Sequence, residues 1–221
     1  DGMSVNVAAE NVQAALSHRA YLKQDGSIER GFEIVTHPHT LEAYQKDLDW
    51  SFIDQLSTDG GISWRTRTCG LHVHVSRRAF TSLVHQALFT YLIQNNEEQM
   101  TRLAGRAGSH WAKFHEDGLR VPAKVKGQSY DRYQAVNMTN RETVEIRIFR
   151  GSLMKRRILM ALELVNACFE YTRLMTSNDY IKGNTSWDAF AKWVRTRKEY
   201  ENLNYYIRLY RLYDNHTVTT N

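Results

Sequence analysis

The sequence has few of the residues that cross-link or interrupt a polypeptide chain. Its 221 residues include two cysteines and two prolines, which excludes a disulfide framework and leads us to expect a reducing, cytoplasmic compartment. No segment is rich in proline or in glycine and serine, so we expect one domain over residues 1–221. The longest stretch without a formal charge, 79–96, contains polar residues such as His85 and Gln94 and predicts an amphipathic helix, not a membrane span. Residues 1–15 lack a basic start and an apolar run, so no signal peptide is expected.

Apolar and charged residues occur in the proportions of a folded domain. Hydrophobic residues make up 42% and charged residues 24% of the chain, which excludes an intrinsically disordered protein. The formal net charge of +5 is modest, and a mildly basic chain binds nucleotide phosphates as readily as nucleic acid. The total charge therefore does not identify a partner.

The spacing of apolar residues predicts a mixture of helices and strands, and hence the α+β class. We expect helices over 8–19, from Leu41 to near Asp59, after Ser76, and over 153–175, 186–197 and 199–213, and strands over 32–35, 71–76, 133–138 and 143–149. The last two strands flank Thr139-Asn140-Arg141 and predict a hairpin. Ser76 is the expected cap of the following helix, whose expected core face is Phe80, Leu83, Val84, Ala87, Leu88, Tyr91 and Leu92. A long loop or lid is expected from about 105 to 128.

Three of the predicted strands place ionisable side chains opposite an apolar face. Side chains two residues apart share a face of a strand. The polar faces carry His72, His74 and Ser76 on one strand, Thr143, Glu145, Arg147 and Phe149 on another, and Glu33 on the strand over 32–35. If these strands belong to one antiparallel sheet, the ionisable groups meet on a single surface.

This surface has the composition of a metal and phosphate site. Two carboxylates and an imidazole suit a divalent cation, for which oxygen ligands favour Mg²⁺ or Mn²⁺ and the imidazole is accepted by Mn²⁺ or Zn²⁺. Arg147 and Arg150 add guanidinium groups, which bind phosphate or carboxylate. A metal and arginines on one surface are what the transfer of a phosphoryl group requires.

Simpler interpretations of the same residues stay open. The pair His72 and His74 is also typical of a polar sheet surface, and Glu145 and Arg147 are also typical of a surface ion-pair pattern. Glu33 taken alone indicates an exposed strand residue, and Arg150 also fits the basic run that precedes a helix. The functional interpretation depends on the joint occurrence of these residues.

The motifs resemble those of a known enzyme superfamily. Residues 70–76, Gly-Leu-His-Val-His-Val-Ser, resemble the G-[LM]-H-x-H-x-S strand of the glutamine synthetase superfamily. Residues 143–147 resemble its E-x-R strand, and the phrase TVEIRIFRGSL is closest to the amidoligase branch. The turn at 25–27 followed by 31–36 is similar to the D-G-S turn and G-x-E-[IV]-[VI]-[ST] strand of that branch. The resemblance spans residues 24–165.

The resemblance implies an ATP-dependent carboxylate–amine ligase, which forms an amide through an acyl phosphate from small-molecule or peptide substrates. The implied fold is a curved, mainly antiparallel sheet backed by helices, with a helical extension over 176–221. The implied cofactors are ATP and Mg²⁺ or Mn²⁺, and nucleic acid and membranes are not expected partners. By this resemblance, the metal ligands are Glu33, His72 and Glu145, and the nucleotide-site residues are His74, Ser76 and Asn137. Arg147 would contact the γ-phosphoryl group, and Arg150 would contact a phosphate or the substrate.

One part of the family pattern is missing, which keeps two other functions open. The superfamily carries an acidic E-x-E pair on an earlier strand, whereas the later Glu199-Tyr200-Glu201 lies in a predicted helix. An upstream strand or a partner then supplies the pair, or the site is incomplete and the chain is a non-catalytic structural or binding module. A metal-dependent phosphoesterase or nuclease that uses His72 and His74 is the other alternative, although its second histidine strand is lacking because residues 37–40 contain proline.

Overall fold

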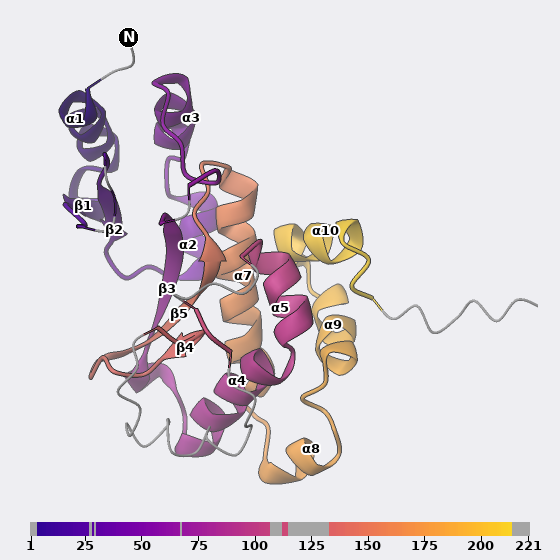
Figure 1. Ribbon diagram of the computed structural model, residues 1–221. Helices are drawn as coiled ribbons and strands as arrows, with labels where there is room; N and C mark the ends of the chain where they lie inside the picture. Colours follow the sequence, from indigo (N-terminus) through magenta and orange to yellow (C-terminus); the bar gives the residue numbers. More distant parts are fainter. Residues whose placement is uncertain are drawn as a thin grey trace, which may run out of the picture. The chain divides into compact units, whose positions relative to one another are not determined.

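The computed structural model describes residues 4–26, 28, 30–66, 68–106, 112–114 and 133–213. These residues form two compact units, Asp1–Gly70 with Arg150–Leu159 and Leu71–Phe149 with Met160–Asn221. Helices are combined with two small antiparallel sheets (Figure 1), so the α+β class is confirmed. The lid expected from 105 to 128 lies almost entirely outside the described residues.

The first unit is built on a helix and a two-stranded sheet. Helix α1 (Val5–Leu16) is capped by Ser4, whose hydroxyl accepts a hydrogen bond from the Val7 N–H. Strands β1 (Ala20–Lys23) and β2 (Glu33–Thr36) pair antiparallel, with Lys23 opposite Glu33. Strand β2 matches the predicted strand over 32–35, whereas β1 was not predicted.

A single helix was predicted after Leu41, and the structure has two. Helix α2 (Leu41–Lys46) and helix α3 (Ser51–Thr58) are separated by a short turn. In that turn Trp50 is buried, and its indole N–H donates to the Tyr44 carbonyl oxygen at 2.8 Å. In a continuous helix this carbonyl oxygen would accept a hydrogen bond from the Leu48 N–H. Here the Leu48 N–H donates to the Ala43 carbonyl oxygen instead. Burial of one tryptophan therefore ends the first helix.

The second unit is organised around a three-stranded sheet in the order β3-β5-β4. Strand β3 is Gly70–Ser76, β4 is Val136–Asn137 and β5 is Thr143–Arg150. Strands β4 and β5 are antiparallel, with Asn137 opposite Glu145, so the predicted hairpin is confirmed. Just beyond the ends of β3 and β5, the Arg77 N–H donates to the Glu142 carbonyl and the Gly151 N–H to that of Cys69, which makes this pair antiparallel too.

The central strand β5 is buried on both faces. Val144, Ile146 and Ile148 are almost fully inaccessible to solvent, as the apolar pattern predicts. On the other face Glu145 and Phe149 are also buried. The second face is therefore a partly enclosed polar environment and not a solvated sheet surface.

Of the described helices of the second unit, two lie between β3 and β4 in the chain, and the others follow β5. They are α4 (Leu83–Asn95), α5 (Glu97–Ala104), α7 (Lys155–Thr172, whose first residues belong to the first unit), α8 (Ser177–Ile181), α9 (Trp187–Arg195) and α10 (Glu201–Leu209). Helices α7, α9 and α10 agree with the three predicted C-terminal helices, and α9 and α10 lie next to each other in Figure 1. Helix α5 ends at Gly105, which has a φ of 67° that glycine adopts without steric cost.

The predicted cap of helix α4 is wrong, and its predicted core face is right only in part, since Leu88 and Leu92 are buried but Leu83 and Val84 are exposed. Ser76 makes no capping hydrogen bond, and Ser82 caps the helix by accepting from the His85 N–H at 3.1 Å. Leu83 is 63% exposed, whereas His85 and Phe89 are buried. The imidazole of His85 is accommodated because its Nε2–H donates to the Phe169 carbonyl oxygen at 2.9 Å and the Thr81 N–H donates to its Nδ1.

Of the helices in the described ranges, none combines the length and the apolar composition that a membrane crossing needs.

Candidate functional site

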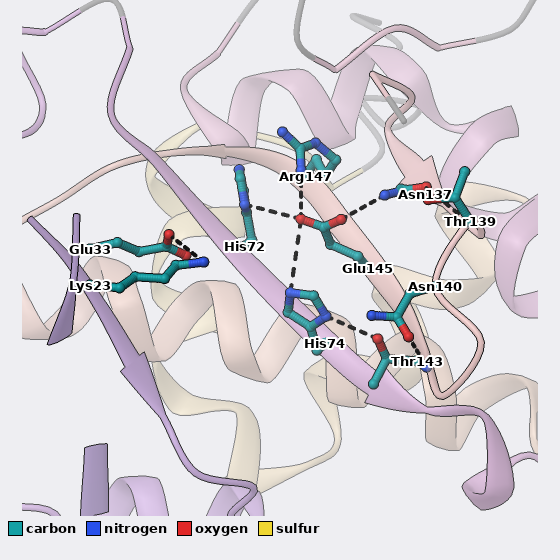
Figure 2. Close-up of polar contacts among 10 residues, drawn as sticks. All are labelled: Lys23, Glu33, His72, His74, Asn137, Thr139, Asn140, Thr143, Glu145 and Arg147. Carbon is teal, nitrogen blue, oxygen red and sulfur yellow. Dashed lines mark hydrogen bonds and ion pairs between the residues drawn. The ribbon is translucent and has the colours of Figure 1, made fainter. Parts of the chain in front are cut away.

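Five of the eight predicted site residues meet in the second unit. Glu145 is buried on the central strand β5, and Arg147 follows two positions later on the same face. His72 and His74 come from β3, and Asn137 from β4 on the other side of β5. Figure 2 shows the four side chains turned towards the Glu145 carboxylate. We call these five residues the Glu145 cluster.

Both oxygens of the Glu145 carboxylate have hydrogen-bonding partners. Oε1 accepts from Arg147 Nη1 at 2.6 Å and from His72 Nδ1 at 3.1 Å, and His74 Nε2 lies 3.8 Å away (Figure 2). Oε2 accepts from Asn137 Nδ2 at 2.7 Å. The carboxylate is therefore surrounded by donors from all three strands.

A second set of hydrogen bonds fixes the orientation of the outer side chains. Asn137 Oδ1 accepts from the Thr139 N–H at 3.0 Å and from its hydroxyl at 2.9 Å. This leaves the amide nitrogen of Asn137 directed at Glu145. On the other side, His74 Nδ1 and the Thr143 hydroxyl form a hydrogen bond of 3.0 Å. Both threonines lie in or next to the turn that joins β4 and β5, so the hairpin itself orients the cluster.

The cluster keeps Glu145 ionised. Burial opposes ionisation and on its own raises the pKa of this carboxyl group. The hydrogen bonds from His72 and Asn137 and the positive charge of Arg147 outweigh burial and lower the pKa of Glu145 to about 2. At neutral pH the site is thus a buried carboxylate whose negative charge is compensated by a guanidinium group.

The arrangement does not fit the expected metal ion. Within the part of the chain that the structure describes, no three histidine, cysteine, aspartate or glutamate side chains are grouped to hold a metal. His72, His74 and Glu145 supply suitable atoms, but the oxygen they share is already bonded to Arg147. A divalent cation bound at Oε1 would lie against a fixed positive charge.

Glu33 belongs to the first unit, on strand β2. Its carboxylate forms an ion pair with Lys23 Nζ at 2.9 Å, and both side chains are partly exposed. This contact raises the pKa of Lys23. Within its unit Glu33 therefore forms a cross-strand ion pair with Lys23. Its role as a metal ligand stays a prediction.

Arg150 and Ser76 are the two remaining predicted site residues. Arg150 ends β5 but belongs to the first unit, where its guanidinium carbon lies 5.1 Å from the centre of the Trp64 ring. The guanidinium carbon of Arg157 lies 4.1 Å from the same ring, as in cation–π pairs. Ser76 is exposed at the end of β3. The roles of Arg150 and Ser76 towards a substrate or nucleotide stay predictions.

Three residues with clear structural roles at these sites were missed from the sequence. Thr143 shares the strand face of Glu145, so the two-residue period contained the signal for its contact with His74. Thr139 follows Asn137 at the spacing at which an asparagine side chain accepts from the backbone two residues later. Trp64 has no local signal, because its partners are brought to it by the fold.

Comparisons of this chain with models of protein families, with curated proteins and with solved structures found no match. The resemblance to the amidoligases therefore depends on the quoted motifs alone. What the described residues add to it is the grouping of His72, His74, Asn137 and Arg147 around Glu145.

Proposed function

We propose that this chain is an ATP-dependent carboxylate–amine ligase. The observation that supports the proposal is the Glu145 cluster, in which residues from the two most distinctive motifs share one carboxylate oxygen. The two motifs are about 70 residues apart in the sequence, and a functional relation between them requires such a meeting. The three-stranded sheet is, in this proposal, part of a curved, mainly antiparallel sheet of the glutamine synthetase type.

The proposed reaction has two steps. A substrate carboxylate attacks the γ-phosphorus of ATP, which gives an acyl phosphate and ADP, and an amine then displaces phosphate to form the amide. The substrates are small-molecule or peptide carboxylates and amines, and the proposed location is the cytoplasm. Charge builds up on the phosphoryl oxygens during the first step, so donors that are positioned in advance lower its barrier.

The residues of the cluster have distinct roles in this proposal. Glu145 fixes the position of Arg147 through the 2.6 Å ion pair, which leaves other guanidinium N–H groups to donate to the phosphoryl group. His72 is oriented by the same oxygen through its Nδ1. Asn137 donates a hydrogen bond to the second carboxylate oxygen of Glu145 and so stabilises the orientation of this carboxylate. The expected Mg²⁺ or Mn²⁺ would enter with ATP, whose phosphates bind such ions.

A coupled phosphate-release assay tests the ligase. The full chain is mixed with ATP, Mg²⁺ and panels of carboxylates and amines, and the proposal predicts phosphate release only when both an acid and an amine are present. Glu145→Gln should abolish this release. Glu142→Gln is the matched control, because Glu142 is an exposed glutamate of the same unit that pairs with Arg78. Unchanged release in Glu145→Gln would contradict the proposal, and hydrolysis of a phosphodiester without ATP would indicate a phosphoesterase.

A second candidate is a non-catalytic binding module. It is favoured by the hydrogen bonding of the Glu145 carboxylate, in which three side chains already occupy most of the about four lone-pair sites of the two oxygens. Calorimetry separates the two candidates. A chain that binds neither ATP nor Mg²⁺ or Mn²⁺ at millimolar concentrations supports the binding module, and one that binds ATP supports the ligase.

A further inference from the structure

The ion pair between Arg147 and Glu145 places a permanent positive charge where a metal ion would have to bind. Arg147 Nη1 lies 2.6 Å from Glu145 Oε1, and the side chains are 16% and 9% exposed. We propose that Arg147 is the resident cation of the Glu145 cluster and keeps divalent metal ions out of it. The cluster then works as an ion pair supported by imidazole groups, and not as a metal centre.

The first support is the hydrogen bonding of the carboxylate. A metal ion needs a free lone pair on an oxygen that other ligands also face. The oxygen that faces both histidines is Oε1, which accepts from Arg147 and from His72. The other oxygen, Oε2, accepts from Asn137. The carboxylate thus turns its shared oxygen to hydrogen-bond donors instead of presenting it to a cation.

The second support is that Asn137 has no oxygen to offer. Its amide oxygen accepts two hydrogen bonds from Thr139, so its nitrogen must be the atom that faces Glu145. An amide nitrogen is a donor and does not ligate Mg²⁺ or Mn²⁺. Asn137 therefore stabilises the carboxylate in the way that suits an ion pair.

The third support concerns what holds Arg147. Its Nε atom is buried and, among the residues that the structure describes, has no hydrogen-bond partner. The ion pair of Nη1 with Glu145 therefore contributes to keeping this guanidinium in place. Only movement or substitution of Arg147 opens the carboxylate to a metal.

The inference goes beyond the proposed ligase, because it concerns a metal ion in the absence of ATP. Removing the charge of Arg147 should free Glu145 Oε1 and let the carboxylate and the two imidazoles, which are not grouped as a metal site in the described part of the chain, move together around an ion. This set of ligands suits Mn²⁺. We therefore expect Arg147→Met to acquire a Mn²⁺ site that the wild-type chain lacks.

Titration with Mn²⁺ alone, followed by the electron paramagnetic resonance signal of the free ion, tests this expectation on the full chain. Arg147→Met should bind Mn²⁺ about tenfold more tightly than wild type or better, since a unit charge next to the ion has been removed. Arg147→Lys keeps the charge and should bind as weakly as wild type. Arg78→Met is the matched control, because Arg78 is an exposed arginine of the same unit that pairs with Glu142. The double variant Glu145→Gln, Arg147→Met should lose the new site.

Two results would overturn the proposal. One is tight Mn²⁺ binding by the wild-type chain that broadens the imidazole resonances of His72 and His74 and is lost in Glu145→Gln. The other is a folded Arg147→Met variant, identified by an unchanged circular dichroism spectrum, that binds Mn²⁺ no better than wild type. If Arg147→Met does not fold, the Mn²⁺ affinities of wild type, Arg147→Lys and Glu145→Gln are compared instead. Tight Mn²⁺ binding by wild type is then enough to refute the proposal that Arg147 keeps metal ions out. Failure of the ligase assay leaves these measurements unaffected.

Discussion

The low pKa of Glu145 predicts how the stability of the protein changes in acid. A lowered pKa in the folded state stabilises the fold at pH values above the ordinary carboxyl pKa, and this stabilisation disappears as the pH falls through the folded value. For Glu145 the ordinary value is 4.5 and the folded value about 2, a difference worth about 3 kcal/mol of the free energy of unfolding. Wild type should therefore lose about 3 kcal/mol between pH 5 and 2 through this one group.

Urea unfolding of wild type and Glu145→Gln at several pH values measures this contribution. At pH 7 the variant should be less stable by about 3–5 kcal/mol, because Arg147 is left without its partner in a partly buried position. The gap should narrow as the pH falls, since wild type loses the same charge by protonation. Glu142→Gln is the control, and its exposed pair with Arg78 should contribute little at any pH. A constant gap between wild type and Glu145→Gln from pH 7 to pH 2 would refute the assignment of the low pKa to Glu145.

Three further predictions concern the packing of the second unit. Ser82→Ala should destabilise the fold by about 1 kcal/mol in thermal unfolding because Ser82 caps α4, whereas Ser76→Ala should have no effect; equal losses would contradict the capping assignment. Glu163→Ala should destabilise the fold by about 3 kcal/mol in urea unfolding, because this buried carboxylate accepts hydrogen bonds from Asn202 and from the Leu203 N–H at the start of α10. A urea midpoint equal to that of wild type would show that α10 does not depend on Glu163. Burial lowers the pKa of His85, so stability should fall as the pH drops from 7 to 5, and His85→Phe should show a weaker pH dependence than wild type unless another group titrates in its place.

The two-residue period of strands allowed most of the site to be predicted. It placed His72 with His74 and Glu145 with Arg147, and these pairs do come together in the structure. This succeeded because the direction of a side chain on a strand is a local property. Asn137 was a candidate only through the resemblance, and the structure places it opposite Glu145 through the predicted hairpin, whose turn residues are also local signals.

Features that depend on distant contacts were not predictable. The sequence offers two serines before helix α4, and the structure starts the helix after Ser82 and buries His85 against Phe169, a residue that is distant in the sequence. The break between α2 and α3 depends on the burial of Trp50. Helix propensities predict neither the start of α4 nor the break between α2 and α3, because tertiary packing overrides small local preferences.

The same limit applies to the chemistry of Glu145. A glutamate and an arginine two residues apart on one strand always lie on the same face, so the motif allows either an ion pair or two separate roles. What favours the ion pair here is the position of β5 in the middle of its sheet, where donors from both neighbouring strands surround the carboxylate. Burial strengthens the attraction between the two charges and raises the cost of separating them. A ligand that draws Arg147 away must therefore supply negative charge of its own, and a phosphoryl group meets this requirement while a bare metal ion does not.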